Sequence, residues 1–161
     1  MHARHWVFNL LSATMLIAFL VGCSSGPVRR VSEPSLRIQQ LTVLADGSWS
    51  AELRVENFSS IPMRFDSLDL GLQIGGHAAG TLTARPAVSV GPESADVVSA
   101  TLQPSLEAKL AVADALAAGR GVAYELKGPV TATPEERRQR TFQIERSSEL
   151  SPAPGLPGVL R

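Results

Sequence analysis

The chain has 161 residues, with 15 Lys and Arg against 15 Asp and Glu, so its formal net charge at pH 7 is zero. This length suits one domain, and the neutral balance argues against a nucleic-acid-binding surface. Cys23 is the only cysteine, which excludes an intramolecular disulfide framework and a metal site built from several cysteines.

Residues 1–22 predict a lipoprotein signal peptide. A basic region holding Arg4 precedes an apolar run of about 14 residues, which is short for a membrane span of about 20 residues. The run leads into Leu20-Val21-Gly22-Cys23, which resembles the lipobox of bacterial lipoproteins. We therefore expect cleavage before Cys23. The alternatives are an ordinary signal peptide, or a membrane anchor with an incidental cysteine.

The lipobox resemblance implies that the sulfur of Cys23 carries a diacylglyceryl group with palmitate-type chains. Such acyl chains hold a protein on a membrane without spanning it. Ser24 follows the cysteine, and by resemblance to lipoprotein sorting a residue other than Asp there favours the outer membrane. In a Gram-negative source the domain would face the periplasm.

Residues 23–35 are rich in Ser, Gly and Pro and have no clean period. We interpret them as the acylated cysteine followed by a flexible tether. Arg29 and Arg30 lie in this tether, where they are either solvated or in contact with anionic head groups.

From Leu36 the apolar residues alternate, which is the pattern of half-buried strands. A change of phase between Ile38 and Leu41 predicts a bulge or bend. Asp46-Gly47 predicts a hairpin turn, and the alternation over 49–55 predicts the returning strand. Further strands are expected near 61–74, 79–84, 88–90 and 98–102.

Residues 105–119 predict one short helix, with Ser105 as N-cap and Gly119 as C-terminal stop. Its apolar face is expected to comprise Leu106, Leu110, Ala113 and Leu116. We expect this face to cover the open end of a sandwich. A membrane-surface role is the alternative, although the polar face carries few cations.

The remaining elements are a strand over 122–128 that ends near Gly128-Pro129, a charged turn, and a last strand marked by Phe142 and Ile144. Residues 151–161 are expected to be a flexible tail. About seven strands with regular turns predict an all-β fold over 36–150. It is expected to be an antiparallel β-sandwich of immunoglobulin/fibronectin-III-like type with one short helix.

Catalytic chemistry is not indicated by any residue pattern. His77 is the only histidine beyond residue 22, and neither cysteines nor clustered carboxylates accompany it at ligand spacing. We expect it to be an exposed hairpin residue. The acid pair Asp66 and Asp69 is interpreted as solvated. We therefore expect a non-enzyme with no catalytic residues, no cofactor and no metal.

One stretch resembles a known family. Residues 53–63, LRVENFSSIPM, are similar to the V-x-N-P-N-x-x-P region of the late embryogenesis abundant type 2 family, whose domain is also called the water-stress and hypersensitive-response domain. Val55, Asn57 and Pro62 match this region, whereas Phe58 and Ser59 replace its usual Pro and Asn.

A second segment carries the same resemblance. Residues 122–128, VAYELKG, are similar to the family's V-x-Y-x-L-x-G strand and contribute Tyr124 and Gly128. The resemblance implies a fibronectin-like sandwich, brings no catalytic residues, and associates the domain with desiccation, cold or osmotic tolerance.

Three functions are therefore open. The first is a non-enzymatic, lipid-anchored envelope protein that shields the surfaces of client or envelope proteins during desiccation or osmotic stress. The second is a protein-binding adaptor in outer-membrane assembly. The third is a carrier of an apolar ligand, which requires a cavity between the sheets.

Overall fold

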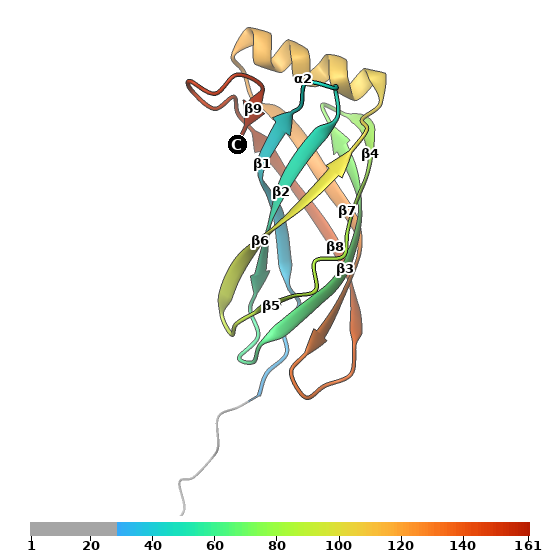
Figure 1. Cartoon of the computed structure of the whole chain (residues 1–161), viewed down its shortest axis with the longest axis vertical. Helices are drawn as coiled ribbons and strands as arrows, with labels where there is room; N and C mark the ends of the chain where they lie inside the picture. The colour runs from blue at the N-terminus through green and yellow to red at the C-terminus, as the bar shows by residue number, and fades with distance from the viewer. Residues whose placement is uncertain (1–28) are drawn as a thin grey trace, which may run out of the picture.

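The computed structural model describes residues 29–161 and shows an antiparallel β-sandwich with one helix across one end (Figure 1). The first sheet has the order β6 (Ser94–Leu102), β2 (Trp49–Asn57), β1 (Ser35–Val43), β9 (Val159–Leu160). The second has the order β4 (His77–Ala84), β3 (Met63–Ile74), β7 (Val122–Pro134), β8 (Arg140–Leu150), and β5 (Val88–Val90) pairs with β3. The predicted fold class is confirmed, with nine strands in the described range instead of about seven.

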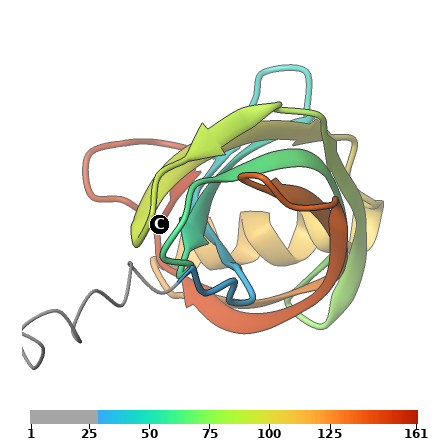
Figure 2. The same ribbon diagram turned by 90° about the horizontal axis from the view of Figure 1, so that it is seen from below.

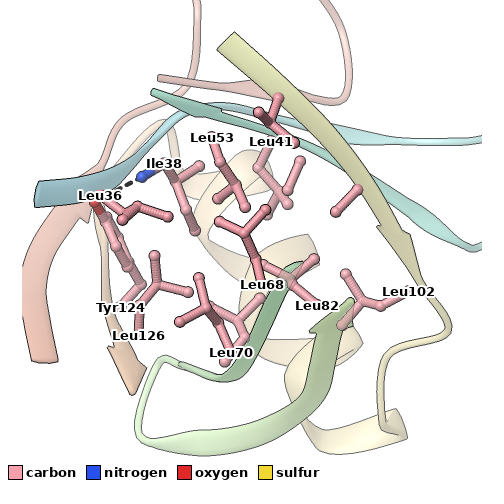
Figure 3. Packing of buried hydrophobic residues seen from close by; sticks show 14 of the residues in the cluster. Leu36, Ile38, Leu41, Leu53, Leu68, Leu70, Leu82, Leu102, Tyr124 and Leu126 are labelled. Carbon is pink, nitrogen blue, oxygen red and sulfur yellow. Dashed lines mark hydrogen bonds between the residues drawn. The ribbon is translucent and has the colours of Figure 1, made fainter. Parts of the chain in front are cut away.

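The two sheets curve around a common interior, as the view along the sandwich in Figure 2 shows. This interior is filled by a single apolar core. In β2 every second side chain is buried, so the alternation in the sequence corresponds to an inner and an outer face. Leu53, Leu70 and Leu126 come from three different strands, and their side chains point into the same core (Figure 3). Each buried leucine contributes about 1.5–3 kcal/mol relative to an exposed one, which stabilises the domain without disulfides.

The β1–β2 hairpin has the predicted turn and bulge. The register shifts between Ile38 and Gln40, which explains the change of phase in the sequence. In the turn, Asp46 Oδ1 accepts the Ser48 N–H at 2.9 Å and Gly47 has a φ of 79°, which glycine adopts without strain. The hydrogen bonds from Ser48 lower the pKa of Asp46.

The helix α2 (Leu106–Ala118) has the predicted ends. Ser105 Oγ accepts the Ala108 N–H, and the Gly119 N–H reaches the Leu116 carbonyl in a left-handed cap. The predicted buried face was wrong at three of its four positions: Leu106 and Leu110 are 66% and 62% exposed, and Ala113 is exposed. Leu116 is half-buried and packs against the core, as expected. The buried residues are Ala108, Val112 and Ala115. Both faces are apolar, and the smaller side chains allow the helix to lie closer to the sheets.

The strand that was expected to end near Gly128-Pro129 continues to Pro134 and pairs with β8 along its length. Gly128 has a φ of 156°, and a Cβ there would lie 2.2 Å from the Asp69 carbonyl oxygen. The glycine is therefore required by the close approach of β3, and it does not end the strand.

The C-terminal segment also differs from the expected flexible tail. Its last residues form β9, which pairs Leu160 with Leu41 of β1, and Leu160 is fully buried. Ser151 and Arg161 exchange two backbone hydrogen bonds of 2.7 and 2.8 Å, which close the segment into a loop. Among residues 29–161 there is no helix of the length and hydrophobicity that a membrane crossing needs.

Candidate functional site at the Asn57 loop

The loop between β2 and β3 is organised by one buried amide side chain. Asn57 is 1% exposed, and its Nδ2 donates to the carbonyl oxygens of Ile61, Val90 and Gly91 at 2.9, 3.1 and 2.9 Å. Its Oδ1 accepts the Ser59 N–H at 2.9 Å. Asn57 thus joins its own loop to the turn after β5, and an asparagine supplies both the donors and the acceptor that this requires.

The N-terminal segment lies against this loop. The Arg30 N–H donates to Ser60 Oγ at 2.8 Å, and the Ser60 N–H donates back to the Arg30 carbonyl at 3.0 Å. The Ser32 N–H donates to Ser59 Oγ at 3.0 Å. Ser59 and Ser60 therefore give the segment two successive attachment points.

Residues 23–35 were expected to form a flexible tether. The contacts above contradict this expectation for residues 29–35, which the structure describes. From residue 29 onward the segment is held against the domain, and Pro34 is buried. Arg29 lies 2.7 Å from a carboxylate oxygen of Glu136, and Arg30 lies 3.5 Å from one of Glu93. Both arginines are therefore paired within the domain.

A shallow polar cleft of about 470 Å³ lies beside this segment. Arg30 and Arg54 line it together with Glu56, Glu93 and the half-exposed Phe58. Arg30 donates to the Phe58 carbonyl at 3.0 Å, and Arg54 lies 3.0 Å from Glu56. The charges of both signs that line the cleft are paired with one another, Arg30 with Glu93 and Arg54 with Glu56.

Three of the predicted motif residues lie around this loop. The side chain of Val55 is fully buried in β2. Pro62 precedes β3, where its missing N–H removes no ladder hydrogen bond, and its carbonyl accepts the Glu135 N–H at 2.9 Å. Cys23 and Ser24 lie outside the described residues.

Tyr124 and Gly128 lie on β7, away from the Asn57 loop. Tyr124 is buried, and its hydroxyl accepts the Ile38 N–H at 3.2 Å next to the bulge in β1 (Figure 3). This hydrogen bond ties the second sheet to the first. The residues of the sequence motif thus serve two structural purposes: Asn57 organises the β2–β3 loop, and Tyr124 connects the two sheets.

Asp66 is, like Asp46, a carboxylate of the described residues with a lowered pKa. Burial raises the pKa of Asp66, but hydrogen bonds from Thr133 and Gln139, together with Arg64, outweigh burial and leave the pKa below its usual value. His77 is exposed at the start of β4. Residues 29–161 contain no set of three or more His, Cys, Asp or Glu side chains that could hold a metal ion.

Sequence reasoning missed the docking of residues 29–34, the cleft and the acidic partners of Arg29. The paired serines at 59 and 60 were the available signal, because two hydroxyls beside an asparagine can bond a passing backbone. Their partners lie 27 and 30 positions earlier in the chain, and no local pattern reports such a distance.

No protein-family model matches this chain, and no curated protein gives a significant match. Among solved structures, an Archaeoglobus fulgidus protein has 17% identity and a TM-score of 0.41, with 77% of this chain and 98% of that chain covered. An Arabidopsis thaliana protein has 13% identity and a TM-score of 0.49, with coverages of 80% and 87%. A protein described as late embryogenesis abundant (LEA) has 15% identity and a TM-score of 0.49, with coverages of 97% and 87%.

Proposed function

We propose that this protein is a non-enzymatic, lipid-anchored envelope protein that protects client proteins during desiccation or osmotic stress by covering their exposed surfaces. The anchor is the acylated Cys23, and the membrane is the outer membrane of a Gram-negative cell, facing the periplasm. The lipobox-like end of the apolar run supports the anchor, and the resemblance of residues 53–63 to the late embryogenesis abundant type 2 family supports the protective role.

The observation that carries this proposal is the position of the exposed leucines. Four leucines with a large exposed fraction lie on α2 and on the two loops beside it: Leu44, Leu106, Leu110 and Leu156. The loop after β1 reaches α2 near Lys109, since a Cβ on Gly47 would lie 3.4 Å from the Lys109 Nζ. Leu156 lines a cleft together with Leu116. We call these four leucines the distal apolar surface.

The distal apolar surface lies at the opposite end of the sandwich from the point where the chain enters (Figure 1). Residue 29 lies at the Asn57 loop, while α2 covers the far end. An anchor on the N-terminal side therefore leaves the leucines facing away from the membrane. Exposed apolar side chains that gather in one place are typical of protein-binding surfaces.

The mixture of apolar and charged side chains on α2 is suited to transient binding of a partner protein. Among the residues of α2, Leu106, Leu110, Ala113 and Ala117 are exposed and recur every three or four positions. Glu107 and Asp114 keep charge on the same helix. Such a mixed surface can bind partly unfolded proteins and release them, without being apolar enough to associate permanently.

The in vivo test is a deletion strain that is dried and rewetted, or exposed to osmotic shock. Survival should be restored by the wild-type gene and not by Cys23→Ala, which cannot be acylated at this position. A deletion strain that survives as well as the parent would refute the protective role. Restoration by Cys23→Ala would refute the need for the anchor alone.

The in vitro test is the recovery of a labile enzyme after drying with the purified chain. The double variant Leu106→Ser/Leu110→Ser should lose most of the protection, because both side chains are exposed and their replacement leaves the core intact. The matched control is Phe58→Ser, which removes an exposed apolar side chain at the other end. Equal protection by both variants would refute the role of the distal apolar surface.

The two other functions make different demands. An adaptor in outer-membrane assembly would give one stoichiometric partner after crosslinking in cells, and the polar cleft at the Asn57 loop is the surface that favours it. A carrier of an apolar ligand needs open space between the sheets, and that space is filled by side chains such as Leu53, Leu70 and Leu126.

A further inference from the structure

The two sheets leave a slot on the side where β4 faces β6. Each of these strands is the end of its sheet, since β4 pairs only with β3 and β6 pairs only with β2 in the described residues. The slot has a volume of about 470 Å³, and residues 83–86 and 88 form one wall while 97–101 form the other. It does not include the distal apolar surface or the cleft at the Asn57 loop.

The backbone of β6 presents unpaired groups to this slot. In an antiparallel ladder, successive residues direct their N–H and C=O groups alternately to the two sides of the strand. The Val97 N–H is bonded to Asp96 Oδ1 at 2.8 Å and not to β2, so Val97 faces the slot. By alternation Ser99 and Thr101 also direct their N–H and C=O groups into it.

The same reasoning applies to β4. The Ala79 carbonyl faces away from β3, because it accepts the Ser105 N–H at 3.0 Å. The register pairs Gly80 with Leu72 and Leu82 with Leu70, so Thr81 and Thr83 direct their backbone groups toward β6. The slot therefore has backbone donors and acceptors on both walls.

The side chains around the slot are short. Apart from Arg85 and Pro86, every lining residue is Ala, Ser, Thr or Val, so few long side chains cover the backbone of the two walls. Arg85 is exposed and makes no ion pair among residues 29–161. It provides a single positive charge on one wall.

Two chain segments lie beyond the ends of the slot. Ser105 bridges to β4 beneath α2 through its N–H and its Oγ, which bond the carbonyls of Ala79 and Ala78. At the other end the chain itself crosses from β5 to β6 through Gly91. The slot thus lies between the start of α2 and the turn from β5 to β6.

We infer that this slot binds an extended peptide segment of about five residues by strand addition to β6, with small apolar side chains turned inward and an acidic group near Arg85. A five-residue strand extends about 17 Å, which matches the length of the wall formed by residues 97–101. Ser99 and Thr101 supply the ladder, and the bond between Asp96 and Val97 ends it. This inference does not depend on the anchor, on stress protection or on the distal apolar surface.

The first test uses a fluorescein-labelled peptide of alternating valine and threonine that ends in glutamate, with the full-length chain in detergent micelles. Fluorescence anisotropy should show saturable binding. The matched control is the same peptide N-methylated at alternate residues, which removes the donors and should weaken binding at least about tenfold. Equal binding of the two peptides would overturn the inference.

The second test locates the peptide without any substitution. Amide hydrogen exchange followed by NMR should slow at Ser99 and Thr101 when the peptide binds, while Val97 changes little because its N–H is already bonded. Slowed exchange at Leu106 and Leu110 alone would place the peptide on the distal apolar surface and overturn the inference. So would peptide-independent dimerisation that protects the same amides.

The third test changes the number of donors. Asp96→Ala frees the Val97 N–H for the peptide and should tighten binding by about fivefold, the value of one added hydrogen bond. Asp96→Asn removes the charge but keeps an oxygen that accepts the Val97 N–H, and its affinity should match the wild type. If Asp96→Asn raised the peptide affinity as much as Asp96→Ala, the lost charge and not the freed Val97 N–H would explain the increase. That result would overturn the role of the backbone donor.

Discussion

Replacing Asn57 by alanine removes the side chain that joins the β2–β3 loop to the turn after β5. The amide nitrogen has two hydrogens for three carbonyl oxygens, so one of the three contacts is shared. Together with the bond accepted from Ser59, about three full hydrogen bonds are lost. Asn57, Ser59 and Ile61 are buried, so several of the former partners remain without water.

A buried group left without a partner costs about 1–3 kcal/mol. For Asn57→Ala we expect a decrease of about 4 kcal/mol in the free energy of unfolding, which is a large part of the 5–15 kcal/mol typical of a domain. With an m-value of about 2 kcal/mol/M in urea, the unfolding midpoint falls by about 2 M.

Urea unfolding monitored by tryptophan fluorescence measures this decrease, because Trp49 is buried in β2. The control variant is Gln143→Ala, which removes an exposed amide side chain from β8 and should change the stability by less than about 0.5 kcal/mol. A midpoint for Asn57→Ala within the error of Gln143→Ala would refute the structural role of Asn57. It would also show that the contacts of the loop are replaceable.

Three further predictions concern stability. Tyr124→Phe leaves the Ile38 N–H without its acceptor and should lower the free energy of unfolding by about 1–2 kcal/mol in urea titrations; no change would mean that water replaces the hydroxyl. Gly128→Ala should lower the free energy of unfolding by at least about 3 kcal/mol, because the added Cβ would overlap the β3 backbone. Gly71→Ala on the facing strand should lower it less, because its Cβ would meet its nearest atom at 3.4 Å. Similar melting temperatures for the two alanine variants would contradict this difference. The lowered pKa of Asp66 means that its stabilisation is complete above the ordinary value of 3.8 and is lost as the pH falls through the folded-state value. The urea midpoint of the wild type should therefore fall more steeply below about pH 4 than that of Asp66→Asn, and parallel profiles would refute the assignment.

The parts of the fold that could be predicted from sequence are those set by neighbouring residues. The hairpin at Asp46-Gly47 and the helix ends at Ser105 and Gly119 depend on turn and cap preferences that a few residues express. The bulge after Ile38 appeared as a change of phase in the alternation. The alternation itself gave the inner face of β2.

The parts that could not be predicted depend on distant contacts. Periodicity could not select the buried face of α2, because it is apolar on both sides. Leu106 and Leu110 are exposed, whereas the buried residues are Ala108, Val112 and Ala115. The sheets selected the smaller side chains. β9 has only two residues, too few for a pattern, and its partner strand lies at the other end of the chain.

Less of the candidate site was available from sequence. Asn57 stood out as a polar residue between apolar runs, but only one of its three carbonyl partners lies in its own loop. The other two lie at the end of β5 and in the turn after it. The slot beside β6 carries no side-chain signature, because backbone groups define it. Only the topology reveals that β4 and β6 are both end strands.

The docked N-terminal segment continues directly into β1, and this connection determines the direction in which a mechanical force acts on the domain. A pull on the N-terminal side, resisted at α2, acts along the length of β1 and parallel to β2, its ladder partner through eight residue pairs. In this geometry the hydrogen bonds are sheared together and do not open one after another as in a zipper. The contacts of Arg30 and Ser32 with the Asn57 loop precede this ladder in the chain, so such a pull loads them before it strains the core.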